Sequence, residues 1–127
     1  MILLLDTTVL IDALRARHNR RSLLAQLVET GHTLTTSAIN IAEVYAGMRP
    51  SEAVATEAFL SNPECYSITP AVARRAGSLR QKWAQRGKTL TLADMIVAAV
   101  SLEHGLTLIT DNRKDFPNPE LSFFPLP

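Results

Sequence analysis

Four carboxylates in this sequence stand beside apolar segments and could act together in chemistry: Asp6, Glu43, Asp94 and Asp111. Charged side chains are rarely buried unless they are paired with an opposite charge or bound to a metal. Carboxylates that lie close to one another must take up protons or bind a cation. Oxygen ligands of this kind favour Mg²⁺ or Mn²⁺, and one or two such ions can activate water for attack on a phosphodiester bond.

Other chemistries find less support in the sequence. The single cysteine, Cys65, and the three histidines lack the ligand spacing of a zinc site. No motif of a serine or cysteine nucleophile is present. One cysteine cannot form an intramolecular disulfide, which is compatible with a reducing compartment. We therefore expect a cluster of hard oxygen ligands.

Each acid also has an ordinary structural interpretation. Asp6 could cap the helix that follows it, and Glu43 could be an exposed helical residue. Asp94 could be an acid that the helix dipole favours in a first turn. Asp111 could be a turn residue beside Asn112. The set is harder to explain in this way, because three of the four acids are expected at one edge of one sheet.

The apolar segments before these acids predict a parallel sheet. Continuous apolar runs at Ile2–Leu5 and Leu106–Thr110 are typical of strands buried on both faces. Shorter strands are predicted at 33–36, 66–68 and 123–124. The expected helices start near Thr7 or Thr8, as N-cap, and then cover about 20–29, 37–46, 51–60, 70–87 and 92–103.

Alternating strands and helices predict a three-layer α/β/α sandwich with a short central parallel sheet, a Rossmann-like arrangement. In such sheets the ligand site lies beyond the carboxyl ends of the strands. Asp6 and Asp111 follow their strands directly, so both should lie at that edge. Asp94 falls in the first turn of a helix that is apolar on most sides, which is the strongest anomaly in the sequence.

Length and composition fit one domain spanning residues 1–127. The hydrophobic fraction of 46% and the charged fraction of 20% are ordinary for a globular protein, and the net charge is only +1. No run approaches the roughly 20 apolar residues that span a bilayer. The N-terminal apolar run is too short for a signal peptide, so we expect a cytoplasmic protein without membrane contact.

Basic residues form two groups that could hold a polyanion. Arg75, Lys82 and Arg86 share one stripe of the predicted helix 70–87, beside an apolar stripe that includes Trp83. A second group lies between Arg15 and Arg21. Both groups could contact RNA phosphates, or they could simply be solvated helix faces.

Four segments carry a specific resemblance. They are Asp6–Asp12 (DTTVLID), Ala42–Gly47 (AEVYAG), Leu92–Ala99 (LADMIVAA) and Thr110–Phe116 (TDNRKDF). In order and spacing they resemble the motifs of PIN-domain nucleases, and most closely those of VapC-type toxins from type II toxin–antitoxin operons. The resemblance runs from Leu5 to Phe116.

The resemblance implies a PIN-like fold and a Mg²⁺- or Mn²⁺-dependent endoribonuclease. Asp6, Glu43, Asp94 and Asp111 would be the metal-binding acids, with Asp6 and Asp94 as core ligands and a metal-bound water as nucleophile. Asp115 is an alternative to Asp111, since both lie in the last motif.

The resemblance also bears on neighbouring residues and partners. Thr7 and Thr110 could hold the ligands in place by hydrogen bonds, or be turn hydroxyls only. Thr8 stands where these toxins often have Asn or Ser. The resemblance further implies a homodimer and a hetero-oligomer with a small antitoxin whose tail reaches the acidic pocket.

Two other functions were considered. A response-regulator receiver needs a phospho-accepting Asp after a middle strand, but no Asp lies between Asp12 and Asp94. A PIN domain could instead serve in RNA processing, or be a catalytically silent RNA-binding module. Loss of acids would mark the silent case, and here they are present.

Overall fold

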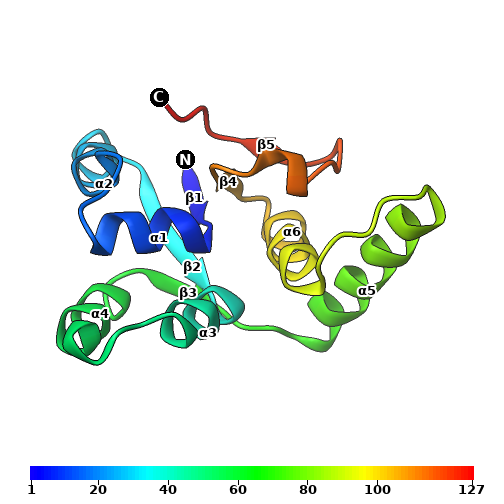
Figure 1. The fold of residues 1–127 in the computed structure, drawn as a ribbon. Helices are drawn as coiled ribbons and strands as arrows, with labels where there is room; N and C mark the ends of the chain where they lie inside the picture. Colours follow the sequence, from blue (N-terminus) through cyan, green and yellow to red (C-terminus); the bar gives the residue numbers. More distant parts are fainter.

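The computed structural model describes residues 1–127 and contains a five-stranded sheet with helices on both faces (Figure 1). The strands are β1 (Ile2–Leu5), β2 (Thr33–Ser37), β3 (Glu64–Tyr66), β4 (Thr107–Ile109) and β5 (Ser122–Phe123). Their order in the sheet is β3-β2-β1-β4-β5, and every neighbouring pair is parallel.

Six α-helices connect the strands. They are α1 (Thr7–Leu14), α2 (Arg20–Glu29), α3 (Ala38–Ala46), α4 (Ala53–Leu60), α5 (Pro70–Gln85) and α6 (Leu92–His104). Two short 3₁₀ turns are also present, η1 (Pro50–Glu52) and η2 (Arg113–Asp115). None of the helices combines the length and the apolar character that crossing a membrane requires.

The core has two parts, one on each face of the sheet. Alternate residues of a strand point to opposite faces, and the central strands are apolar on both. Leu3, Leu5 and Ile109 pack against α1, α2 and α4. Leu4 and Leu108 pack against α5 and α6. The predicted three-layer α/β/α sandwich is therefore confirmed.

Two short strands lie slightly earlier than the sequence predicted. β3 covers 64–66 rather than 66–68, because its register is set by pairing with β2 and not by apolar residues; Tyr66 lies opposite Ser37. Thr69 must also be free to cap α5, where its hydroxyl accepts from the Val72 amide. β5 covers 122–123 rather than 123–124.

The first helix, α1, already begins at Thr7, which is earlier than an N-cap at Thr7 or Thr8 would allow. Asp6 is the N-cap of α1, and its Oδ1 accepts from the Thr7 amide at 2.9 Å. The Asp6 amide itself donates to the Ile109 carbonyl at 3.0 Å. The sheet ladder thus continues to Asp6, and the prediction of a threonine cap was wrong.

The chain changes direction across the sheet between β1 and β4. From β1 it builds outward through β2 to β3, and then returns to β4 on the other side of β1. Such a switch point opens a crevice at the carboxyl ends of the two strands, where ligands bind in open α/β sheets. Asp6 follows β1 and Thr110 follows β4, so both lie at this crevice.

Candidate active site

Asp6 is held at the switch point by hydrogen bonds to both carboxylate oxygens. Oδ1 accepts from the Thr7 amide at 2.9 Å, and Oδ2 accepts from the Thr110 hydroxyl at 2.7 Å. The side chain is only 6% exposed. Burial raises the pKa of Asp6, the two hydrogen bonds oppose that rise, and the charges of Asp94 and Glu43 add to it. The predicted contact of Thr7 and Thr110 with this acid is present.

Asp94 lies in the first turn of α6 and is partly buried. Thr91 caps this helix, and its hydroxyl accepts from the Asp94 amide at 3.1 Å. Burial raises the pKa of the Asp94 carboxyl, the Thr91 side chain lowers it, and the charges of Asp115 and Glu43 raise it. The helix that carries Asp94 is fixed by its buried residues from Met95 to Ser101, which pack in the core.

Glu43 comes from α3 and is joined to the Asp6 turn by a hydroxyl. Its Oε1 accepts from Thr7 Oγ1 at 2.7 Å. Thr7 Oγ1 in turn accepts from Asn40 Nδ2 at 3.0 Å. Since the Glu43 charge raises the pKa of both Asp6 and Asp94, the structure brings these three predicted acids together.

The two acids of the last motif differ in their contacts: Asp111 is paired with Arg20, whereas Asp115 influences the pKa of Asp94. Asp111 Oδ1 accepts from Arg20 Nη2 at 2.6 Å, and the Arg20 side chain is buried. Asp115 lies in η2, and its charge raises the pKa of Asp94. Asp111 has no such effect on Asp6 or Asp94. Asp111 follows the strand as expected, but its carboxylate is engaged by Arg20, the first residue of α2.

The carboxylate group suits a hard divalent cation. All its donors are oxygens, as Mg²⁺ and Mn²⁺ prefer. No three of the histidine, cysteine and acidic side chains are arranged to hold a metal ion by themselves. Mg²⁺ usually keeps several waters and binds through one or two carboxylates, so a looser group fits it. Burial and, to a smaller extent, repulsion between the acids raise the pKa of Asp6 and Asp94, and a bound cation would offset both effects.

The three basic residues of the predicted stripe, Arg75, Lys82 and Arg86, have different surroundings in the structure. Arg75 Nη1 donates to Glu103 Oε1 at 2.8 Å. Glu103 lies nine residues after Asp94 on α6, about 13 Å along the helix axis, so Arg75 is bound far from the acids. Lys82 is exposed, and the Arg86 guanidinium lies 5.2 Å from the centre of the Trp83 ring. These two lie toward the end of α5 that leads into the Asp94 turn.

The cluster between Arg15 and Arg21 is largely occupied by internal contacts. Arg15 pairs with Glu52, with Nε 2.9 Å from Oε2. Arg20 pairs with Asp111, and Arg21 donates to the carbonyls of Ala13 and Leu14. The loop that presents Arg20 is strained, since Ala16, His18 and Asn19 all have positive φ.

Sequence reasoning missed Asn40, and it missed the pairing of Arg20 with Asp111. Asn40 is fully buried and lies three residues before Glu43, on the same face of α3. That spacing is a signal that could have identified it. The Arg20–Asp111 pair joins residues 91 apart in the chain, and no local pattern predicts such a contact.

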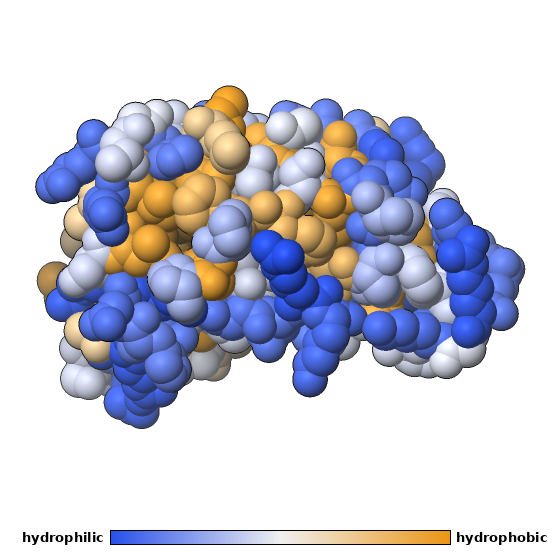
Figure 2. All heavy atoms as spheres, turned by 90° about the horizontal axis from the view of Figure 1, so that it is seen from above, coloured by the Kyte–Doolittle hydropathy of each residue, from blue (hydrophilic) through white to orange (hydrophobic).

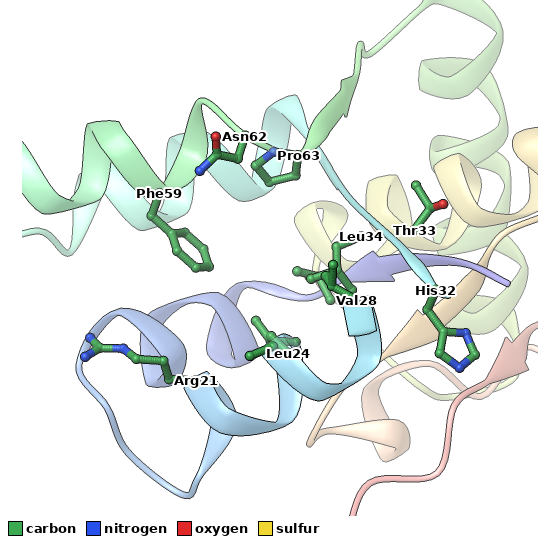
Figure 3. Close-up of a pocket in the computed structure, with 11 residues that line it drawn as sticks. Arg21, Leu24, Val28, His32, Thr33, Leu34, Phe59, Asn62 and Pro63 are labelled. Carbon is green, nitrogen blue, oxygen red and sulfur yellow. The ribbon is translucent and has the colours of Figure 1, made fainter. Parts of the chain in front are cut away.

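A separate apolar groove lies between α2 and α4, beside the start of β2. Its volume is about 510 Å³. Figure 3 shows Phe59 directed toward Leu24, with Val28 and Leu34 farther along, and Arg21 and His32 at the two ends. Val28 is 56% exposed. Figure 2 shows, on the face where the N-terminus lies, apolar side chains exposed in a continuous area bordered by hydrophilic ones.

The sequence matches the model of the family described as PIN domain over residues 3–119. The chain belongs to the PIN-domain family. The membership confirms the resemblance carried by the four motifs, which lie within the matched residues. It also agrees with the position of the acids, which gather at the carboxyl edge of this PIN domain's parallel sheet.

Relatives and solved structures agree with this membership. The chain is 32% identical to ribonuclease VapC19 of Mycobacterium tuberculosis over 114 residues, which covers 90% of this chain and 91% of that protein. A toxin–antitoxin complex from Klebsiella pneumoniae has a chain 30% identical to this PIN domain, with a TM-score of 0.78 and coverage of 97% and 96%. VapBC2 from Rickettsia felis, bound to a promoter DNA fragment, shares the fold with a TM-score of 0.84 at 24% identity, covering 98% of each chain.

Proposed function

We propose that this PIN domain is the toxin of a type II toxin–antitoxin system and that it cleaves RNA as a Mg²⁺- or Mn²⁺-dependent endoribonuclease. The observation that carries the proposal is the group formed by Asp6, Asp94 and Glu43 at the switch point. Burial and mutual repulsion raise the pKa of two of these acids. The relatives named as VapC ribonucleases support the choice of RNA as substrate.

Each acid of the group has a distinct role in the proposal. Asp6 and Asp94 would hold the ion, Asp6 in the orientation fixed by Thr7 and Thr110. Asp115 replaces Asp111 as the fourth acid, because it acts on Asp94 while Asp111 is paired with Arg20. Glu43 offers Oε1 to Thr7, which leaves Oε2 as the oxygen that can contribute to binding the ion.

The ion, when bound, would supply Lewis-acid activation of the phosphodiester and of water. The chain's own residues prepare the site for it. The sheet edge fixes Asp6, the cap of α6 fixes Asp94, and the buried helix behind them excludes water from one side. Lys82 of α5 and Arg86, which directly follows α5, would contact RNA phosphates, whereas Arg75 is bound to Glu103.

We propose that an antitoxin binds in the apolar groove between α2 and α4. The toxin–antitoxin complex from Klebsiella pneumoniae contains a chain of this fold that is 30% identical to this PIN domain. An apolar segment of an antitoxin could bury Val28, Leu34 and Phe59 there. We further propose that the toxin forms homodimers and that the dimers carry antitoxin as a hetero-oligomer.

One experiment tests the nuclease and another tests the toxin. Purified protein should cleave RNA with Mg²⁺ or Mn²⁺ and stop in excess EDTA, and Asp94→Asn should abolish cleavage while the far-UV circular dichroism stays unchanged. Robust cleavage in EDTA would overturn the metal mechanism. Induction of the wild-type gene should arrest growth, and induction of Asp94→Asn should not; equal growth of both strains would contradict the toxin.

A further inference from the structure

A chain of three hydrogen bonds links the interior of the protein to Glu43. The Ser37 hydroxyl donates to Asn40 Oδ1. Asn40 Nδ2 donates to Thr7 Oγ1 at 3.0 Å, and Thr7 Oγ1 donates to Glu43 Oε1 at 2.7 Å. Every link runs in the same direction, toward the carboxylate.

Burial gives the start of this chain no alternative partner. Ser37 and Asn40 are both 0% exposed, so water cannot replace a lost hydrogen bond. A buried polar group without a partner costs free energy. Asn40 lies three residues before Glu43, so both side chains leave the same face of α3, and α3 packs against α1, which carries Thr7.

The direction of the chain follows from the donors that each group possesses. A threonine hydroxyl has one proton, and an ionised carboxylate can only accept. Because Asn40 donates to Thr7, the proton of Thr7 is free to point at Glu43. With the Asn40 amide reversed, Thr7 would have to donate to Asn40, and Glu43 would face a lone pair instead of a proton.

Thr7 also contacts the neighbouring acid. Its backbone amide donates to Asp6 Oδ1, while its side chain donates to Glu43. One residue therefore fixes the distance between two of the acids. Asn40 determines the hydrogen bond between the Thr7 side chain and Glu43. Because Asn40 donates to Thr7 Oγ1, the hydroxyl proton of Thr7 points at Glu43.

We propose that Asn40 is a positioning residue that orients the Glu43 carboxylate toward the divalent cation, acting through Thr7. The inference rests on the proposed function. It gives this fully buried amide, which touches none of the reacting atoms, a role in metal affinity. A side chain that served stability alone would not have this effect.

The test is a double-mutant cycle on Asn40→Ala and Thr7→Val. Mn²⁺ affinity is measured by electron paramagnetic resonance of the free ion, alongside thermal unfolding and steady-state cleavage of an RNA oligonucleotide. Each single variant should lower Mn²⁺ affinity about 10-fold and reduce kcat, with little change in KM for RNA. The double variant should be no worse than either single one, because both substitutions break the same link.

Thr35→Val is the matched control. Thr35 is also 0% exposed, and its hydroxyl donates to the Leu3 carbonyl inside the sheet. This variant should lose stability while its Mn²⁺ affinity stays within twofold of the wild type. The inference is overturned if Asn40→Ala binds Mn²⁺ like the wild type, or if the two losses add in the double variant. Wild-type protein that binds no Mn²⁺ would overturn the proposed function, and this inference with it.

Discussion

The Thr110 hydroxyl donates to Asp6 Oδ2 at 2.7 Å, and this bond joins residues 104 apart in the chain. Thr110 also accepts from the Asn112 amide at 3.0 Å. A single side chain thus orients the most buried acid and shapes the turn that leads toward Asp115. The bond joins the residue after β1 to the residue after β4, at the point where the path of the chain across the sheet reverses.

Replacing this hydroxyl should affect both stability and activity. Thr110→Val leaves Asp6 Oδ2 without a donor and the Asn112 amide without an acceptor, so we expect a loss of about 1–3 kcal/mol in the free energy of unfolding. RNA cleavage should fall about 10-fold. Urea unfolding and initial cleavage rates measure the two effects. Thr8→Val, at an exposed position of α1, should change the free energy of unfolding by less than about 0.5 kcal/mol.

Substitutions of Asp111 and Asp115, the two acids of the last motif, should have different effects on cleavage and stability. Asp115→Ala should lower cleavage about 10- to 100-fold with little loss of stability. Asp111→Ala should keep most of the cleavage, but it leaves the buried Arg20 unpaired and should cost about 2 kcal/mol. Chemical denaturation and cleavage assays on both variants give the comparison. The reverse assignment, with activity lost only in Asp111→Ala, would return Asp111 to the metal group.

Asp94 should destabilise the metal-free protein at neutral pH. Its folded pKa is raised above 3.8, so the folded state binds the proton more tightly than the unfolded state does. Well below pH 3.8 the carboxyl is protonated in both the folded and the unfolded state, so it does not lower the free energy of unfolding. As the pH rises through the folded pKa the cost becomes complete.

Asp94→Asn should therefore raise the Tm in EDTA at pH 7. Solvent screens the partly buried charge, so we expect a gain of about 0.5 kcal/mol, or roughly 2 °C. The difference should vanish near pH 3. Saturating Mg²⁺ should reverse the order, because the ion stabilises only the protein that binds it. Differential scanning calorimetry of both proteins, with and without Mg²⁺, measures these Tm values. A lower Tm for Asp94→Asn than for the wild type in EDTA at pH 7 would contradict the prediction.

Acid should also weaken the contact between the end of α1 and η1. The Arg15 guanidinium lowers the pKa of Glu52 to about 2, against 4.5 for the free side chain. The stabilisation from this pair is complete above pH 4.5 and is lost as the pH falls toward 2. Glu52→Gln should thus be less stable than the wild type at pH 6, and the two proteins should converge near pH 2. A constant difference across this range in urea titrations would argue against the pair.

The apolar groove allows a test of the partner that leaves the acids untouched. Val28→Asp should weaken the affinity for the proposed antitoxin about 30-fold, equivalent to about 2 kcal/mol of binding free energy. Cleavage without that partner should be unchanged. Val54→Asp is the matched control, since Val54 is 83% exposed on α4 and does not line the groove. Titration calorimetry measures both, and equal affinities would remove the groove from the proposal.

Strong local patterns predicted most of the fold. The buried strand Ile2–Leu5 and the helix Arg20–Glu29 occur where the sequence predicts them, because apolar runs and helical periodicity are local properties. The edge strand at Glu64–Tyr66 was misplaced, since pairing with β2 decides its register.

The candidate site was predictable in part for the same reason. Asp6 and Asp94 were identified from a strand end and from an apolar helix turn. The choice between Asp111 and Asp115 depends on Arg20, which is distant in sequence and adjacent only in the folded chain. The role of Asn40 needed the contact between α1 and α3, although its spacing from Glu43 was visible.

The two strands that meet at the switch point are far apart in the sequence: β1 begins at Ile2, and β4 ends at Ile109. During translation β4 and the turn with Asp115 are made after all six α-helices. A nascent chain therefore holds Asp6 without Thr110 until this late stage. The proposed nuclease site is assembled only after Thr110 and Asp115 have been added to the chain.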